Sequence, residues 1–178
     1  YLEDLYVKPE CRGKGYGKYL WDEVLSRYPG MTFGADSVPD QVASYETDGF
    51  SVAYGNARYS GSALPGPDEN GPSLTPAGSV DFDALVEFDG RHCFGPRPDF
   101  LRPWIEGPGR EALVATDESG GITGFAASRM SSGGTRIGPV FADEREIARA
   151  LILTLAERAG GRVAVDVPLP NQAAVDLL

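Results

Sequence analysis

One stretch of the chain decides the fold: Tyr1-Leu2-Glu3-Asp4-Leu5-Tyr6-Val7-Lys8-Pro9-Glu10-Cys11-Arg12-Gly13-Lys14-Gly15-Tyr16-Gly17-Lys18-Tyr19-Leu20. Residues 2–7 are a short run of apolar and β-favouring residues, and Pro9 follows them with no N–H to donate to a strand ladder. From Lys18 onward, apolar residues recur every three or four positions until Pro29-Gly30. The stretch therefore predicts a strand, a loop and the start of a helix.

Three alternating glycines, Gly13, Gly15 and Gly17, form the predicted loop. Because every second side chain is missing, backbone N–H groups can converge on an anion, and the helix points its positive N-terminus at the same place. Positive charge is added by the neighbouring cations Arg12, Lys14 and Lys18. Hydrogen bonds to a charged group contribute about 1.5–3 kcal/mol each, so the loop is suited to a diphosphate.

The glycine spacing is neither that of the P-loop, which ends in Gly-Lys-Ser/Thr, nor that of the Rossmann fingerprint. Arg12-Gly13-Lys14-Gly15-Tyr16-Gly17 resembles the acyl-coenzyme A pyrophosphate loop of the GNAT superfamily of N-acetyltransferases, Arg/Gln-x-x-Gly-x-Gly/Ala. The preceding Leu-Glu-Asp-Leu-Tyr-Val-x-Pro is similar to the strand before that loop in polyamine and related amine acetyltransferases. The resemblance implies acetyl-CoA as cosubstrate and no metal. It assigns cofactor binding to Leu5, Tyr6, Val7, Arg12, Gly13, Lys14, Gly15, Tyr16, Gly17 and Lys18.

A second motif, Ser44-Tyr45-Glu46-Thr47-Asp48-Gly49-Phe50, resembles the Phe-Tyr-x-x-x-Gly-Phe segment of GNAT enzymes. In that family the tyrosine commonly protonates the departing coenzyme A thiolate, which implies a catalytic role for Tyr45. The residues alone also allow an ordinary tyrosine on an amphipathic helix. The family often has phenylalanine where Ser44 stands and asparagine near Val38, so the pantetheine contacts depart from the pattern on this side.

Two acidic residues, Glu3 and Asp4, are candidates for a general base. A primary amine with a pKa of about 10.4 is protonated at pH 7, and removing its proton costs about 4–5 kcal/mol, which a carboxylate can assist. The two side chains point to opposite faces of the expected strand, so only one can face the cleft. Resemblance to polyamine acetyltransferases implies Glu3, with Asp4 as the alternative. A solvated carboxylate is the other interpretation.

The order of predicted elements gives the fold class and the domains. We expect an α/β (α+β) fold with a GNAT-like mixed central sheet flanked by helices. The expected elements are strands at 31–36, 51–59, 112–116, 122–130, 136–140 and 163–167, and helices at 40–46, 80–89, 98–105 and from 143 onward. Residues 1–60 would be the C-terminal portion of a GNAT domain that carries the acetyl-CoA loop, 61–79 a linker, and 80–178 a second, degenerate GNAT-like domain, as in tandem acetyltransferases.

The second domain lacks a glycine loop. Its equivalent is Phe141-Ala142-Asp143-Glu144-Arg145-Glu146, which reads as a capping box with three carboxylates. Acids stabilise a helix start through its dipole but repel a diphosphate, so we expect no ordinary coenzyme A binding there. Because Tyr1 already lies in the strand before the loop, we expect a portion of a longer protein. A rearranged fold in which the two halves complete each other is the alternative.

The composition of the chain limits the classes of binding partner that we expect. The net charge of −10 argues against general nucleic-acid binding and favours cationic substrates. No apolar run approaches the ~20 residues that span a bilayer, and no signal peptide is visible. Cys11 and Cys93 show neither a metal-type spacing nor a disulfide framework, and free thiols fit a reducing compartment. We therefore expect a cytoplasmic protein without a membrane partner. His92 is expected to have a packing or surface role, and Cys11 to be a spectator thiol.

Three functions remain open on the sequence. The first is direct transfer of an acetyl group from acetyl-CoA to the primary amine of a small molecule. The second is a non-catalytic acyl-CoA-binding or regulatory module, and the third is a protein N-acetyltransferase that acts on a lysine or a chain terminus. Each is compatible with a homo-oligomer.

Overall fold

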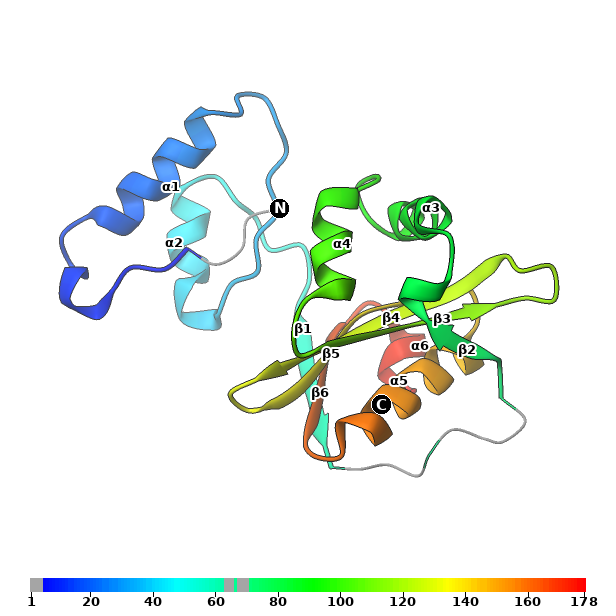
Figure 1. The fold of residues 1–178 in the computed structure, drawn as a ribbon. Helices are drawn as coiled ribbons and strands as arrows, with labels where there is room; N and C mark the ends of the chain where they lie inside the picture. The colour runs from blue at the N-terminus through cyan, green and yellow to red at the C-terminus, as the bar shows by residue number, and fades with distance from the viewer. Residues whose placement is uncertain (1–4, 63–65, 67–70) are drawn as a thin grey trace. The chain divides into compact units, whose positions relative to one another are not determined.

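The computed structural model describes residues 5–62, 66 and 71–178, and the chain divides into two compact units, 1–53 and 54–178. The first unit contains helices α1 (Tyr16–Ser26) and α2 (Val42–Thr47), preceded by the 3₁₀ turns η1 (Pro9–Cys11) and η2 (Pro39–Gln41) (Figure 1). Both helices were predicted, because the apolar stripe of α1 and the Pro-Gly and Gly-Phe signals after the helices are local features.

Two predicted strands are not seen among the described residues of the first unit. Residues 5–7 have no strand pairing, and residues 2–4 lie outside the described part of the chain. Residues 31–36 show a single bridge at Ala35 instead of a strand. A strand needs a neighbour for its ladder hydrogen bonds, and residues 5–53 as described contain no sheet that could supply one.

The second unit is built on a six-stranded mixed sheet of order β1-β6-β5-β4-β3-β2. Its strands are β1 (Asn56–Gly61), β2 (Leu74–Pro76), β3 (Arg110–Thr116), β4 (Ile122–Ser131), β5 (Gly134–Ala142) and β6 (Val163–Pro168). Neighbouring strands are antiparallel except β5 and β6, which are parallel and pair only from Thr135 to Ile137 on β5. Beyond Ile137 the two parallel strands separate.

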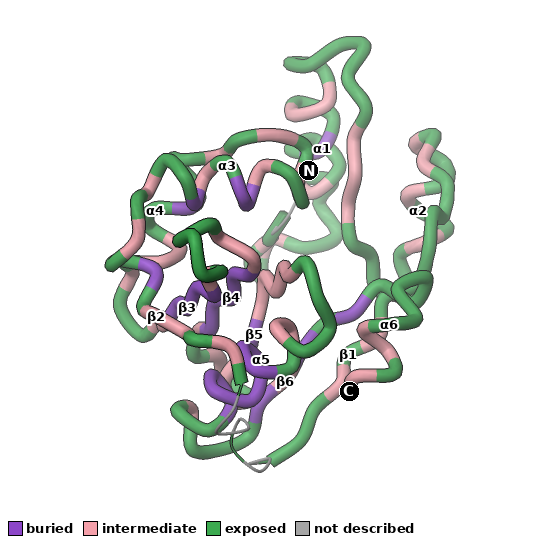
Figure 2. The backbone as a smooth tube through the Cα atoms, turned by 90° about the vertical axis from the view of Figure 1, so that its right-hand side faces the viewer, coloured by how far each residue is buried: buried purple, intermediate pink, exposed green. Residues whose placement is uncertain are grey.

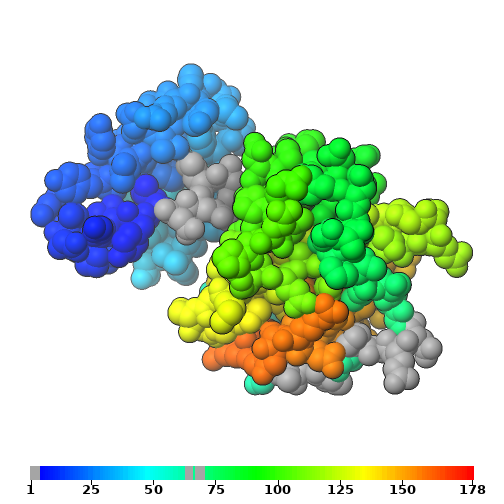
Figure 3. Space-filling view, viewed as in Figure 1, coloured from blue at the N-terminus to red at the C-terminus, as the bar shows by residue number. Residues whose placement is uncertain are grey.

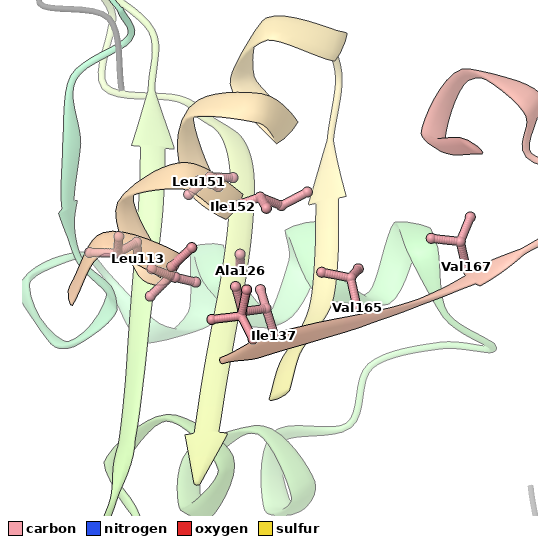
Figure 4. Packing of buried hydrophobic residues seen from close by; sticks show 10 residues of the cluster. Leu113, Ala126, Ile137, Leu151, Ile152, Val165 and Val167 are labelled. Atoms are coloured by element: carbon pink, nitrogen blue, oxygen red, sulfur yellow. The ribbon is translucent and has the colours of Figure 1, made fainter. Parts of the chain in front are cut away.

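Helices cover both faces of this sheet (Figure 1). On one face, α5 (Arg145–Ala159) packs against a core that includes Leu113, Ala126, Ile137 and Val165 (Figure 4). On the other face, α3 (Phe82–His92) and α4 (Pro98–Glu106) pack against β3 and β4. Buried residues accordingly concentrate in β3, β4, β6 and α5 (Figure 2). The short helix α6 (Gln172–Val175) follows β6.

A local sequence signal explains the start of α3 but not that of α5. The Asp81 carboxylate accepts a hydrogen bond from the Ala84 N–H at 2.8 Å and so caps α3. Helix α5 begins after Glu144, whose side chain makes no capping hydrogen bond, so the predicted capping box is wrong. A methyl group on Gly124 would collide with Ile147, which shows how closely α5 approaches β4.

The chain around the predicted domain boundary contains regular structure among its described residues. The strand predicted at 51–59 is instead β1, and it pairs along its whole length with β6. The predicted linker 61–79 contains β2 and the turn η3 (Ala77–Ser79), in which Ala77 is buried. The two compact units of the structure divide between Ala53 and Tyr54, whereas the predicted first domain runs to residue 60. Residues 54–60 therefore fold with the second unit, because their backbone partners lie in β6.

Candidate active site

The glycine loop leads directly into α1, as predicted. Gly13 and Gly15 have φ of +73° and +82°, a left-handed conformation in which side chains other than glycine are strained. Gly15 is the N-cap of α1 and provides no side-chain hydrogen bond to the helix start. The N–H groups of the first helical turn, at Tyr16, Gly17 and Lys18, have no acceptor four residues earlier within α1. The arrangement leaves several backbone donors available at one helix N-terminus, as an anion site requires.

The cations of the loop have different surroundings. The Arg12 guanidinium donates from Nε to the Val7 carbonyl at 3.1 Å and lies 5.8 Å from the Tyr6 ring centre. Lys14 is exposed and forms no ion pair with another described residue. Lys18 pairs with Asp22 and, at 3.3 Å, with Asp48, and the hydrogen bond to Asp22 raises the pKa of Lys18 above its ordinary 10.5. Lys18 therefore connects α1 to the end of α2.

An aromatic cluster places Tyr45 beside α1. The Tyr45 ring lies edge-on to Trp21 at 5.1 Å between ring centres and 5.9 Å from Phe50. Trp21 is 6% exposed, and its indole N–H has no hydrogen-bond partner among the described residues. Trp21 is five residues after Tyr16, about 8 Å along the helix axis. The structure thus brings the glycine loop and Tyr45 to neighbouring parts of the same unit.

The other predicted site residues are less constrained. Glu3 lies outside the described residues. Leu5 and Tyr6 are 48% and 66% exposed, while Val7 is half-buried and lies beside Gly17. These three residues were expected to form a strand, and the loop instead folds back on them through the Arg12 contact with the Val7 carbonyl.

The second unit shows a different helix start at the equivalent place. Asp143 donates its N–H to the Thr123 carbonyl at 2.9 Å, so this donor belongs to the sheet. His92 stacks on Phe141 at 5.0 Å and contacts Phe88 at 4.9 Å, which is the packing role expected for it. Among the described residues, no group of three metal-ligating side chains is found. No helix in the described ranges is long and apolar enough to cross a bilayer.

Sequence reasoning missed the part that Trp21 plays. The residue was included in the apolar stripe of the first helix, and it is buried as the periodicity predicts, whereas Leu20 of the same stripe is 42% exposed. Its specific neighbours, Tyr45 and Phe50, follow from how α1 and α2 pack, which no local pattern encodes. A tryptophan on a short helix next to a candidate site was the available signal, because buried aromatic rings of this size dominate packing.

A mixed sheet flanked by helices, together with a glycine loop at a helix N-terminus, defines the chain as an α/β protein. Residues 85–178 match the family model of an acetyltransferase (GNAT) domain, and residues 1–62 match a second such model. The chain belongs to the GNAT acetyltransferase family, which is a family of enzymes.

Curated relatives carry the same assignment. Holothin acyltransferase from Pseudoalteromonas sp. (strain SANK 73390) is 29% identical over 167 residues, which are 91% of this chain and 55% of that protein. The uncharacterised N-acetyltransferase YitH from Bacillus subtilis (strain 168) is 27% identical over 135 residues, or 75% of this chain and 48% of YitH. The chain thus spans about half the length of these relatives.

Solved structures share the fold. A Pyrococcus horikoshii protein assigned to the acetyltransferases aligns with a TM-score of 0.74 at 21% identity, over 96% of this chain and 56% of that one. The GCN5-related N-acetyltransferase from Kribbella flavida aligns with a TM-score of 0.63 at 24% identity, over 99% of this chain and 47% of that one. At these identities the likeness concerns the fold.

Proposed function

We propose that this chain carries the acyl-CoA site of an N-acetyltransferase that moves an acetyl group from acetyl-CoA to a primary amine by direct transfer. The observation that carries the proposal is the start of α1, where left-handed Gly13 and Gly15 open the backbone and no side chain caps the helix. Family membership supports the same donor. The tandem organisation, with a degenerate second domain, is part of the proposal.

The residues that would bind the diphosphate of coenzyme A lie in and around the loop. Backbone N–H groups from residue 13 to residue 18 supply the donors, and Arg12 and Lys14 add charge within reach of the same helix end. Lys18 contributes its backbone N–H, because its ammonium is already paired with Asp22 and Asp48. In the proposal, the backbone of residues 5–7 offers further donors and acceptors to the pantetheine arm.

The thioester supplies an acyl group that a neutral amine can attack. Glu3 accepts the amine proton, directly or through a water molecule, and so provides the nucleophile at neutral pH. A backbone N–H of residues 5–7 polarises the carbonyl. Tyr45, whose ring is positioned by Trp21 and Phe50, donates its phenolic proton to the leaving sulfur.

A small-molecule acceptor is the favoured class. One relative is named for acylation of holothin, and the net charge of −10 attracts cationic amines before they lose a proton. Cytoplasmic location and independence from nucleic acid and membrane belong to the same proposal.

Release of free thiol from acetyl-CoA, measured across matched panels of small amines and peptides, tests the proposal. We expect turnover with small primary amines. Acetyl-CoA binding without turnover on either panel would show a non-catalytic acyl-CoA module, and turnover on peptides alone would show a protein N-acetyltransferase.

A further inference from the structure

Arginine side chains form a row across one face of the second unit's sheet. Arg110 on β3 pairs with Arg129 on β4, and Arg129 pairs with Arg136 on β5. The row continues from Arg136 to Ala164 on β6 and then to Ser60 on β1. Directly paired residues on neighbouring strands share a face, so the three guanidinium groups start from adjacent positions on one side.

This face is the one that α3 and α4 cover only in part. Ala112 and Ala127, two residues before or after Arg110 and Arg129, are buried under these helices. Neither β1 nor β6 contributes a buried residue to that core, whereas Val163 and Val165 face α5 on the opposite side. The β1-β6-β5 end of the face is therefore left with polar side chains.

Two more arginines join the row at this end. Arg58 lies on β1 two residues before Ser60, and Arg162 immediately precedes β6 and donates to the Ser60 hydroxyl at 3.0 Å. A backbone hydrogen bond also joins β5 to Arg162, because the Thr135 N–H donates to the Arg162 carbonyl at 2.9 Å. The β4–β5 hairpin (yellow) and the stretch before β6 (orange) accordingly lie side by side in Figure 3.

The surface is concave where these groups meet. A hollow of about 500 Å³ is lined by Arg58, Arg136 and Arg162, by Ser60, and by the β4–β5 turn with Ser131. Guanidinium groups and hydroxyls supply donors from several directions, which suits a tetrahedral oxyanion. All of the lining residues belong to the second unit.

The charges in this region are poorly balanced within the described chain. Asp166 is the carboxylate of the region, and it is shared by Arg58 at 2.6 Å and Arg136 at 3.5 Å. Arg129 has no ion pair with any described residue, and one guanidinium nitrogen of Arg110 is buried without a hydrogen-bond partner there. Arg110 lies instead against the Trp104 ring at 4.0 Å. Like charges on directly paired strand positions are destabilising unless a counter-charge accompanies them.

We propose that this arginine face, defined as Arg58, Arg110, Arg129, Arg136 and Arg162, is a binding site for a phosphate-bearing small molecule. In a protein with a net charge of −10, these five guanidinium groups on one sheet face form a local patch of the opposite sign. Asp166 pairs with Arg58 and Arg136, whereas Arg110 and Arg129 lie over the Trp104 ring, at 4.0 and 5.9 Å from its centre. Arginine forks bind phosphate oxygens in pairs, and a phosphate carries enough negative charge to offset neighbouring cations. The site is independent of the glycine loop, which lies in the other unit.

Calorimetric titration of the protein with inorganic phosphate and with pyrophosphate tests the proposal. We expect the Arg129→Gln/Arg136→Gln variant to lose at least about tenfold in affinity for the better of the two anions. The anion that binds with the higher affinity shows whether the site takes one phosphoryl group or a diphosphate. Unchanged affinity in the variant, or no binding of either anion by the unaltered protein, would overturn the proposal.

Two controls separate this site from other effects. Arg158→Gln changes an arginine that pairs with Glu111, and Glu111 lies on the opposite face of the sheet, the one that α5 covers. This variant should leave anion affinity unchanged. Gly15→Val alters the glycine loop alone, so it should remove any binding there and spare the arginine face. Without ligand, Arg129→Gln should not lower the melting temperature, because it relieves like-charge repulsion. A large drop would assign Arg129 a structural role and overturn its place in the site.

Discussion

At the residue scale, Tyr45, the proposed general acid, is held by aromatic packing. Its ring contacts Trp21 and Phe50, so the ring orientation depends on aromatic contacts and not on the hydroxyl group. Removal of the hydroxyl should therefore leave the local structure unchanged and affect only proton donation.

Tyr45→Phe is expected to reduce kcat about 100-fold or more, the usual contribution of a general acid, with almost no change in the Kd for acetyl-CoA. Thiol release and calorimetry measure the two quantities separately. Tyr28→Phe, the same change at an exposed tyrosine after α1, is the matched control and should behave like the unaltered protein. Equal activity of Tyr45→Phe would remove Tyr45 from the mechanism.

A second residue-scale feature is the ion pair between Asp89 of α3 and Arg97, the N-cap residue of α4. The Arg97 guanidinium donates twice to the Asp89 carboxylate, at 2.7 and 2.9 Å, and Asp89 is fully buried. Arg97→Met should lower the free energy of unfolding by about 3–5 kcal/mol, because it leaves a buried carboxylate without its partner.

Chemical denaturation measures this effect. The double variant Asp89→Leu/Arg97→Met should recover most of the loss, because no buried charge remains. Arg158→Met, which breaks an exposed pair, should cost less than about 1 kcal/mol. A loss for Arg97→Met as small as that of Arg158→Met would contradict the account.

At the element scale, the β3–β4 turn is organised by one carboxylate. Asp117 accepts hydrogen bonds from the Ser119 hydroxyl at 2.7 Å, the Ser119 N–H at 2.8 Å and the Gly121 N–H at 2.9 Å. The Ser119 hydroxyl, followed by the backbone of Gly121, lowers the pKa of Asp117 below its ordinary 3.8. The charged form is the one that the turn favours.

The turn should therefore be supported above the unfolded-state pKa and lose this support as the pH falls through the lower, folded-state pKa. An NMR titration of the Asp117 carboxyl carbon should give a midpoint below 3.8. Ser119→Ala should move that midpoint upward, since it removes the largest cause. A midpoint at or above 3.8 in the unaltered protein would contradict the assignment.

Elements with their own local signals were predictable from the sequence. The apolar stripe of α1, the two apolar strands on either side of the Asp117 turn and the long apolar face of α5 all appear within a few residues of their predicted bounds. Segments 5–7 and 31–36 have the composition of strands, but a strand also needs a partner, and composition does not supply one. The loop and Tyr45 came from motifs, whereas their packing through Trp21 came only from the structure.

At the scale of the whole molecule, β1 is matched by one family model but pairs with a strand that is matched by the other. The family model that matches residues 1–62 includes β1, yet in the structure β1 is the edge strand next to β6, and it is β6 that lies within residues 85–178, the part matched by the other family model. The Arg58–Asp166 pair, with a second hydrogen bond at 3.0 Å, adds side-chain contacts to this pairing. The region matched by the first model thus contributes one strand to the sheet of the region matched by the second.

Hydrogen exchange followed by mass spectrometry should show residues 56–61 protected together with β6. Residues 31–34, which form no ladder, should exchange quickly and serve as the internal control. Tyr59→Pro, which places a residue without an N–H in the strand, should abolish the protection of β1. Fast exchange of residues 56–61 in the unaltered protein would contradict the pairing with β6.

Calorimetric titration with acetyl-CoA, of the unaltered protein and of Gly15→Val, tests the central claim most directly. A branched side chain is strongly disfavoured at the left-handed conformation of Gly15, so the variant should misplace the backbone donors at the start of α1. We predict binding by the unaltered protein and at least a tenfold loss of affinity, of about 1.4 kcal/mol, in the variant. No heat from the unaltered protein, or equal affinity in both, would contradict the claim that this loop binds the cosubstrate.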